Sequence, residues 1–364
     1  MKTTKKIGLL IILYLMVVIF VENDAWLYKM PIVKITKVSE EEKTILDAAR
    51  NQKEVYYEQT LTGILQNGTR KGKGVILRNE YSYSGVLDQK YHKGDKVFVG
   101  VSGKSLSGGI KGIKRDGYLV VLLGGLLLLL LIVSGKNGLL TIGTFVVNLM
   151  IFGIGFARFL KGEDLFRVCN VLAVSFTLAT LILLNGFRRK TWAAICSTLC
   201  VLVLIMWLFD VVTLHMPELD FSTMEYLGSL DNPDDLFRAE IMLSGLGAIM
   251  DVTVTISTAM EEIVKKNSRA SFLQLFHSGR EIGYDIMGTM MNVLLFVFVC
   301  GLIPAFLIHM NNEVSFFTII KWNLSVEICR FLVESIGIIL AIPISILIAS
   351  ICMKITFSKE KIGK

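Results

Sequence analysis

The sequence contains little proline, little histidine and few charged side chains for a chain of its length. Its 364 residues include five prolines and four histidines, and 19% of them are charged. Soluble globular proteins are about 25% charged, whereas 53% of this chain is hydrophobic and its mean hydropathy is +0.61. This composition excludes an ordinary soluble protein and predicts one that crosses a membrane several times.

Cysteine is scarce too, and its placement is informative. All six cysteines lie in or beside long apolar runs, and none lies between residues 25 and 116. That segment therefore has no disulfide framework. The chain also lacks a Ser/His/Asp arrangement, zinc-ligand spacing and a phosphate-binding loop. We expect no catalytic residues, no metal and no cofactor.

The positive charge is concentrated in residues 25–116. This segment holds 17 Lys and Arg against 10 Asp and Glu, which equals the +7 net charge of the whole chain. We expect this segment to lie outside the cytoplasm, where anionic lipid or a wall polymer is a more plausible partner than nucleic acid.

The same segment is predicted to be a small β-rich barrel or sandwich with one helix. The helix would begin at Ser39, which can cap its first amides, and Glu40–Glu42 would favour its positive end. Short runs rich in β-branched and aromatic residues follow. They are separated by "NGTRKG" and "HKGD", which are typical of hairpin turns.

Long apolar runs predict an all-α polytopic membrane protein with about eight transmembrane helices. The first, Ile7–Val21, follows a basic flank, and Asn23 disfavours cleavage after Ala25, so we interpret it as an uncleaved anchor. Seven more runs have about the 17–25 residues that a span needs. The predicted parts are an anchor (1–24), a β-rich extracytoplasmic domain (25–116), a seven-helix transmembrane bundle (117–357) and a cytoplasmic tail (358–364).

The distribution of Lys and Arg favours cytoplasmic termini. Basic residues are more frequent in the short segments that this orientation places inside. It also places outside the segment "PELDFSTMEYLGSLDNPDD", which has six acidic residues and no basic one. Such a loop would raise the local cation concentration, although a solvated amphipathic connector is an equally good interpretation.

Two neighbouring apolar segments carry polar stripes at helical spacing. In Ala239–Val264 the stripe includes Ser244, Gly247, Asp251, Thr255, Thr258 and Glu262, and in the next segment it includes Glu281, Asp285, Gly288, Thr289 and Asn292. A charged side chain at mid-membrane costs about 2.5–3.5 kcal/mol, so it should face a protein interior or a water-filled path. We expect a polar groove between these two helices, with glycines allowing their close packing.

The segments that carry these stripes resemble the YibE/F-like family of bacterial multi-pass membrane proteins. The resemblance rests on "GAIMDVTVTISTAMEEI" and "GREIGYDIMGTMMNVLLFVFVCG", and more loosely on "NGTRKGKGVILRNEYSYSG" and "YHKGDKVFV" in the soluble segment. It implies a bacterial plasma membrane and places the family's polar signature on Asp251, Glu262, Gly279, Gly283, Asp285, Gly288, Thr289 and Asn292. It implies no established mechanism, because members are mostly described either as permeases by inference or as uncharacterised.

Three classes of function fit the sequence. The first is a permease or secondary transporter, in which Asp251 and Asp285 bind a proton or cation and Thr255, Thr289, Asn292 and Glu262 assist. The second is a non-catalytic scaffold or envelope-assembly partner that acts through residues 25–116. The third, an intramembrane aspartyl protease, is weakly indicated: "GYD" at Gly283–Asp285 matches half of that pattern, and the other half is absent. We expect a permease rather than an enzyme.

Overall fold

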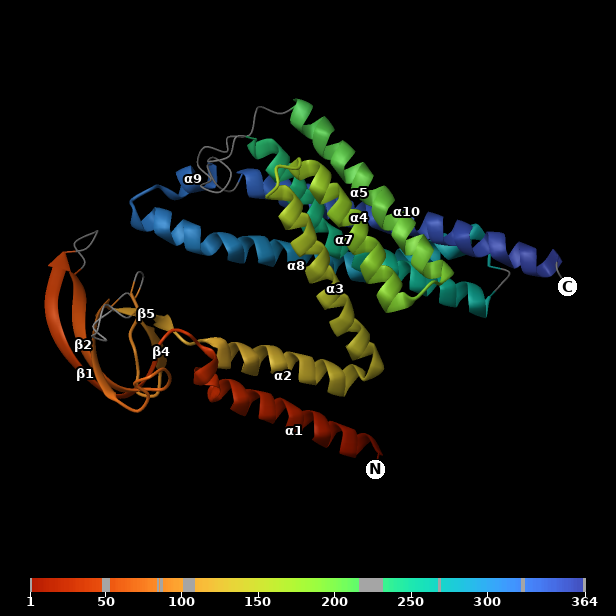
Figure 1. Ribbon diagram of the computed structural model, residues 1–364. Coiled ribbons are helices and arrows are strands. Elements are labelled where there is room, and N and C mark those ends of the chain that lie inside the picture. Colours follow the sequence, from red (N-terminus) through yellow and green to blue (C-terminus); the bar gives the residue numbers. More distant parts are fainter. Residues whose placement is uncertain are drawn as a thin grey trace. The chain divides into compact units, whose positions relative to one another are not determined.

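The computed structural model describes residues 2–47, 53–83, 85, 88–100, 109–215, 232–267, 270–321 and 325–362. It separates into two compact units, Met1–Leu139 and Leu140–Lys364. Figure 1 shows a sheet and two helices in the first unit and a bundle of long helices in the second.

The first unit contains an antiparallel sheet of five strands in the order β3-β2-β1-β4-β5. The strands are β1 (Ile32–Asp47), β2 (Lys53–Leu65), β3 (Gly74–Ser82), β4 (Lys96–Val99) and β5 (Ile110–Ile113). One face is apolar, with Val33, Ile35, Leu61, Leu77 and Val97 buried together. The alternation of buried and exposed residues along β3 is what a half-buried strand requires.

The helix predicted from Ser39 is wrong, because these residues belong to β1. Ser39 pairs with Thr60, and Glu41 pairs with Glu58, within a long β1–β2 ladder that Figure 1 shows as two curved strands. The acidic run that resembled a helix start instead lies on this hairpin, where Glu40 pairs with Lys90 at 2.8 Å. Cross-strand pairing thus outweighs local helix signals, as is common for strands.

The two predicted turns have different outcomes. "NGTRKG" connects β2 to β3, which pair directly, and Gly68 and Gly72 have positive φ angles as a tight turn requires. "HKGD" is also a turn, with Gly94 at φ 105°. It is not a hairpin, however, because β4 pairs with β1 rather than with the preceding β3.

Buried charges connect the sheet to its two helices, α1 (Lys2–Glu22) and α2 (Asp116–Ser134). Lys114 lies between Asp24, which belongs to the short helix η1 (Asp24–Leu27), and Asp116, at 2.7 and 2.8 Å. Tyr28 donates a hydrogen bond to Asp116 at 2.5 Å. Because Lys114 and Asp24 are both buried, this ionic cluster stabilises the packing of the sheet against the adjoining helix ends.

The second unit is built from long helices. They are α3 (Lys136–Phe159, whose first turn lies in the first unit), α4 (Leu165–Asn185), α5 (Arg189–His215), α7 (Pro233–Lys266), α8 (Phe272–Asn311), the short α9 (Phe316–Ile319) and α10 (Ser325–Ile362). Caps define several starts: Asp164 accepts from the Arg167 amide, and Ser271 and Gln274 form a capping box before α8.

Seven helices of the described residues are long and apolar enough to cross a membrane: α2, α3, α4, α5, α7, α8 and α10. They match the seven apolar runs after residue 116 and indicate a membrane-embedded protein. The predicted eighth span is not confirmed, because α1, although helical, is not among the seven.

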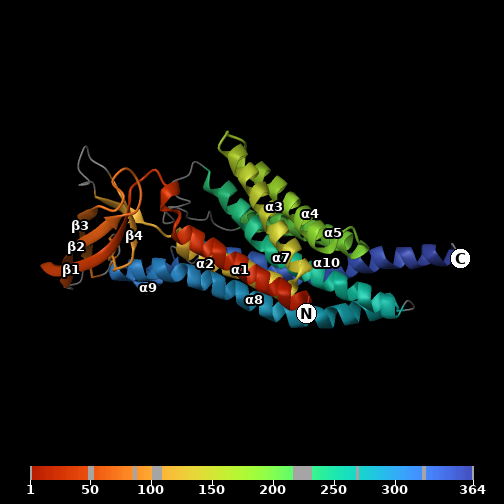
Figure 2. The same ribbon diagram turned by 60° about the horizontal axis from the view of Figure 1, so that its bottom comes forward.

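Helix α10 packs against α5, α7 and α8, and α7 also packs against α4 and α5. Figures 1 and 2 both show α4, α5 and α7 side by side. Gly337 of α10 allows this packing, because a Cβ there would lie 2.1 Å from Ile205 of α5. Inside the bundle, Thr198 of α5 and Thr253 of α7 share a buried hydrogen bond of 2.8 Å.

Candidate functional site

The polar stripe of α7 lies on the surface of its unit. Asp251 and Glu262 are exposed and Thr255 is half-buried. Thr255 donates to the backbone carbonyl of Asp251 at 2.8 Å, and Glu262 lies 3.4 Å from Lys265. The hydroxyl and the carboxylate thus find partners on their own helix.

The stripe of α8 has the same character. Asp285, Thr289 and Asn292 are all exposed. Thr289 donates to the carbonyls of Asp285 and Ile286 at 3.1 and 2.9 Å, and Asn292 donates to the carbonyl of Gly288 at 2.8 Å. Over the described residues, no hydrogen bond or ion pair connects this stripe to that of α7.

The glycines of α7 and α8 pack mainly against α10 rather than against each other. A Cβ on Gly283 would lie 2.4 Å from Ile342, and one on Gly279 would lie 2.7 Å from Ile346, both on α10. Gly279 also approaches Met260 of α7. Gly288, which shares the polar stripe, faces open space. The close packing predicted from glycine is real, but its main partner is α10.

A charged cluster lies between α7 and α10, and its centre is Arg330. Glu327 and Glu334 are buried, and Arg330 and Glu240 are partly buried. The guanidinium is ion-paired with Glu240 of α7 and with Glu327 of its own helix, the latter at 2.5 Å. It also lies over the ring of Phe298 of α8, 4.5 Å from the centroid. A cation paired with two carboxylates and stacked on an aromatic ring suits the planar geometry of arginine.

Glu334 lies one helical turn after Arg330 on α10 and is 1% exposed. Its Oε1 accepts a hydrogen bond from the hydroxyl of Ser244 on α7, and its Oε2 has no hydrogen-bond partner in the described part of the chain. Gly245 of α7 packs beside it, and a Cβ there would lie 3.4 Å from Glu334 Cγ, an ordinary van der Waals distance. Burial of a carboxyl group with one unpaired oxygen is costly and points to a functional role.

An open cavity of about 550 Å³ lies between α4 and α7 and borders this cluster. It is lined by Glu240 and Ser244 together with Cys169, Leu236, Ala239 and Leu243. Ser244 therefore borders the cavity and also contacts the buried Glu334. At the same end of the bundle, Asp210 of α5 is ion-paired with Arg238 of α7.

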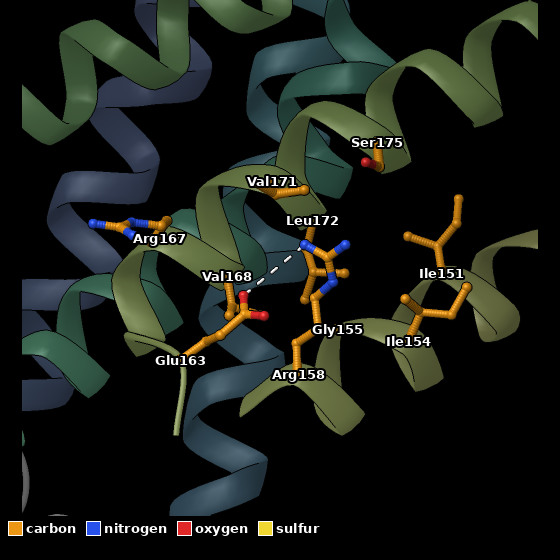
Figure 3. A pocket seen from close by; sticks show the side chains of 10 residues that line it. All are labelled: Ile151, Ile154, Gly155, Arg158, Glu163, Arg167, Val168, Val171, Leu172 and Ser175. Carbon is orange, nitrogen blue, oxygen red and sulfur yellow. Dashed lines mark ion pairs between the residues drawn. The ribbon is translucent and has the colours of Figure 1, made fainter. Parts of the chain in front are cut away.

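A second cavity, of about 250 Å³, lies between α3 and α4 (Figure 3). Arg158 and Glu163 point toward one another, with 3.9 Å between their charged atoms. Most of the remaining lining is aliphatic, including Ile151, Ile154 and Leu172. Apart from this ion pair, Arg167 and Ser175, the cavity is therefore apolar.

Sequence reasoning selected the stripes and missed Glu334, Glu240 and Glu327. A signal was present, because Glu327, Arg330 and Glu334 follow one another at spacings of three and four, the pattern of one helix face. The acidic loop predicted as a cation-concentrating mouth falls mainly on residues 216–231, which lie outside the described residues.

Comparison with protein families supports the resemblance noted from the two striped segments. The model of the YibE/F-like protein family matches residues 122–355, and the model of the YibE/F family N-terminal domain matches residues 26–113. The chain belongs to the YibE/F-like family. No curated protein and no solved structure matches it. The YibE/F-like match includes both polar stripes, the Arg330 cluster and Glu334.

Proposed function

We propose that this YibE/F-like protein is a permease or secondary transporter for a solute or ion in a bacterial plasma membrane, with both termini cytoplasmic. The observation that carries the proposal is the charged cluster between α7 and α10, which lies inside membrane-spanning helices and borders an open cavity. Ionisable residues at such positions are rare and commonly serve ion or proton pathways.

The polar stripes on the surfaces of α7 and α8 supply the candidate ligands for the transported species. Asp251 and Asp285 are the candidate ligands for a solute or cation, and their oxygens are the ligands that hard cations prefer. The neutral candidates Thr255, Thr289 and Asn292 have lone pairs left for a ligand, since their described hydrogen bonds are donated to the backbone. Glu262 is a weaker candidate because it faces Lys265.

A scaffold or envelope-assembly role is the second candidate. It is favoured by the sheet of the first unit, whose edge strand β3 exposes Ile76 and is followed directly by the exposed Tyr83. An edge strand with exposed apolar side chains is a common place for a partner to bind. In this alternative, anionic lipid or a wall polymer would bind the basic first unit.

Flux measurements test the transport proposal. The full-length protein is reconstituted in liposomes, and the movement of protons, Na⁺ and K⁺ is followed with indicator dyes for the wild type, Asp251→Asn and Arg158→Ala. We expect flux above that of empty liposomes for the wild type and for Arg158→Ala, and a loss in Asp251→Asn. Flux that never exceeds that of empty liposomes for ions and for a panel of organic solutes would favour the scaffold role.

A further inference from the structure

Glu334 differs from the other carboxylates of its cluster in making no ion pair with any residue that the structure describes. Arg330 is ion-paired with Glu240 and Glu327, and Glu334 has only the neutral hydroxyl of Ser244. Burying an ionised carboxylate without a cation is far more costly than burying the neutral acid. Burial therefore favours the neutral form of Glu334 more than that of any other carboxyl group of this cluster.

The helices that pack against α10 do not supply the missing cation. On α7, the ionisable group facing Glu334 is Glu240, which is itself acidic. On α5, Asp210 at the same end is ion-paired with Arg238. Helix α8 places the uncharged Phe298 against Arg330. On α10 itself, the charged neighbours are Arg330 and Glu327.

The hydroxyl of Ser244 has two oxygen neighbours but only one hydrogen atom to donate. Its Oγ lies 2.7 Å from the backbone carbonyl oxygen of Glu240 and within hydrogen-bond distance of Glu334 Oε1. A hydroxyl donates only one hydrogen bond but accepts two. If Glu334 is ionised, Ser244 donates to it. If Glu334 is protonated, Glu334 donates to Ser244, and Ser244 donates to the Glu240 carbonyl. The same geometry serves both protonation states.

We propose that Glu334 is a reversible proton-binding site of the membrane bundle, connected to the cavity between α4 and α7 by the hydroxyl of Ser244. Protonation forms one O–H bond on the carboxylate and removes one negative charge, and deprotonation returns the proton to water. A proton is favoured over a metal ion because, in the part of the chain that the structure describes, no three His, Cys, Asp or Glu side chains converge as metal ligands. The inference deepens the proposed transport function and rests on it for its role as a coupling step.

Infrared spectroscopy of the full-length protein in liposomes tests the proton site directly. The wild type is titrated with acid, and the carbonyl stretch of a protonated carboxyl group is recorded alongside Glu334→Gln and Asp251→Asn. We expect the carboxyl band of the wild type to contain a component that is absent from Glu334→Gln and retained in Asp251→Asn. A folded Glu334→Gln protein with an unchanged band would overturn the proposal.

Chemical labelling needs no variant and so does not depend on whether Glu334→Gln folds. Dicyclohexylcarbodiimide reacts with protonated carboxyl groups in apolar surroundings, and mass spectrometry locates the modified residue. In the wild type we expect labelling at Glu334 that decreases as the pH is raised. The absence of label at Glu334 at every pH, with label on other carboxylates, would count against the site.

Variants of Ser244 test the relay. Ser244→Ala should shift the pH midpoint of the infrared band, and Ser244→Thr, which keeps a hydroxyl, should restore it. Equal midpoints in all three proteins would remove Ser244 from the proposal. Flux measurements separate this inference from the transport function. Titration of Glu334 without any flux supports the proton site and contradicts transport. Flux without titration of Glu334 supports transport and contradicts the proton site.

Discussion

Glu334 and Asp251 are both acidic residues of membrane-spanning helices, but they differ in burial and in their neighbours. Glu334 is 1% exposed, next to an arginine that is already ion-paired with two carboxylates. Asp251 lies on the surface of the unit among side chains that bond to their own helix. The buried carboxylate is therefore part of the packing of the bundle, whereas Asp251 makes no ion pair or side-chain hydrogen bond in the described residues.

The strongest test of this difference is removal of the central cation. Arg330→Ala leaves Glu240 and Glu327 without their shared partner, and breaking a buried ion pair from one side costs about 3–5 kcal/mol. We expect a loss of that size in the free energy of unfolding, measured by circular dichroism of the detergent-solubilised protein with added denaturant.

Arg158→Ala is the matched control for Arg330→Ala. Arg158 and Glu163 are separated by 3.9 Å and have side chains 59% and 45% exposed. Exposed pairs contribute about 0–1 kcal/mol, so this variant should be almost as stable as the wild type. Equal losses for the two arginine variants would show that burial does not distinguish the two ion pairs.

The two sides of α8 provide a second test. Gly283→Val places side-chain atoms where even a Cβ lies 2.4 Å from Ile342, and overpacking of this kind costs about 1–3 kcal/mol. Gly288→Val, five residues further along α8 on the polar stripe, meets open space and should leave the stability nearly unchanged. The same unfolding measurement compares the two. A larger loss for Gly288→Val would mean that the stripe is covered by another chain.

These packing contacts show what a single sequence could and could not predict. The seven spans after residue 116 follow from hydropathy alone, because the bilayer sets the length of an apolar helix. The partner of Gly283 could not be predicted, since helical spacing shows that a face is small but not which helix covers it. The strand at Ser39 was missed because its pairing with Thr60 is non-local.

Glu334 was missed for a different reason. The stripes drew attention because they contain many polar residues, whereas Glu334 lies in a helix that is otherwise strongly apolar near it. Its neighbours Ser244 and Glu240 are ninety or more residues before it on another helix. Only the packing of α7 against α10 reveals that these side chains form one cluster.

The buried ions at the base of the sheet extend the comparison outside the spans. Burial alone would lower the pKa of Lys114, but its hydrogen bonds with Asp116 and Asp24 together raise it. The hydrogen bond to Asp116, with burial, raises the pKa of Tyr28 to about 12. Because the folded-state pKa is raised, the contribution of Tyr28 to stability is complete below pH 10 and is lost as the pH rises through about 12.

Alkaline titration checks this prediction. Tyrosinate absorbance of the wild type should include one group that ionises near pH 12, and Tyr28→Phe should lack it. The variant should also lose about 1 kcal/mol of unfolding free energy at neutral pH, the usual contribution of one hydrogen bond. A Tyr28→Phe protein that instead lacks a group ionising near pH 10 would contradict the hydrogen bond to Asp116.

The smallest change in stability is expected from the stripes themselves. Asp251→Asn and Asp285→Asn keep the shape of each side chain and break no ion pair or side-chain hydrogen bond seen in the described residues, so each should change the unfolding free energy by no more than about 0.5 kcal/mol. If these carboxylates bind the transported species, liposome flux should nevertheless fall while the fold is intact. A change in stability above about 1 kcal/mol would instead show that the stripes are packed against a partner in the membrane. The sharp contrast between buried and exposed carboxylates would then hold for the isolated chain alone.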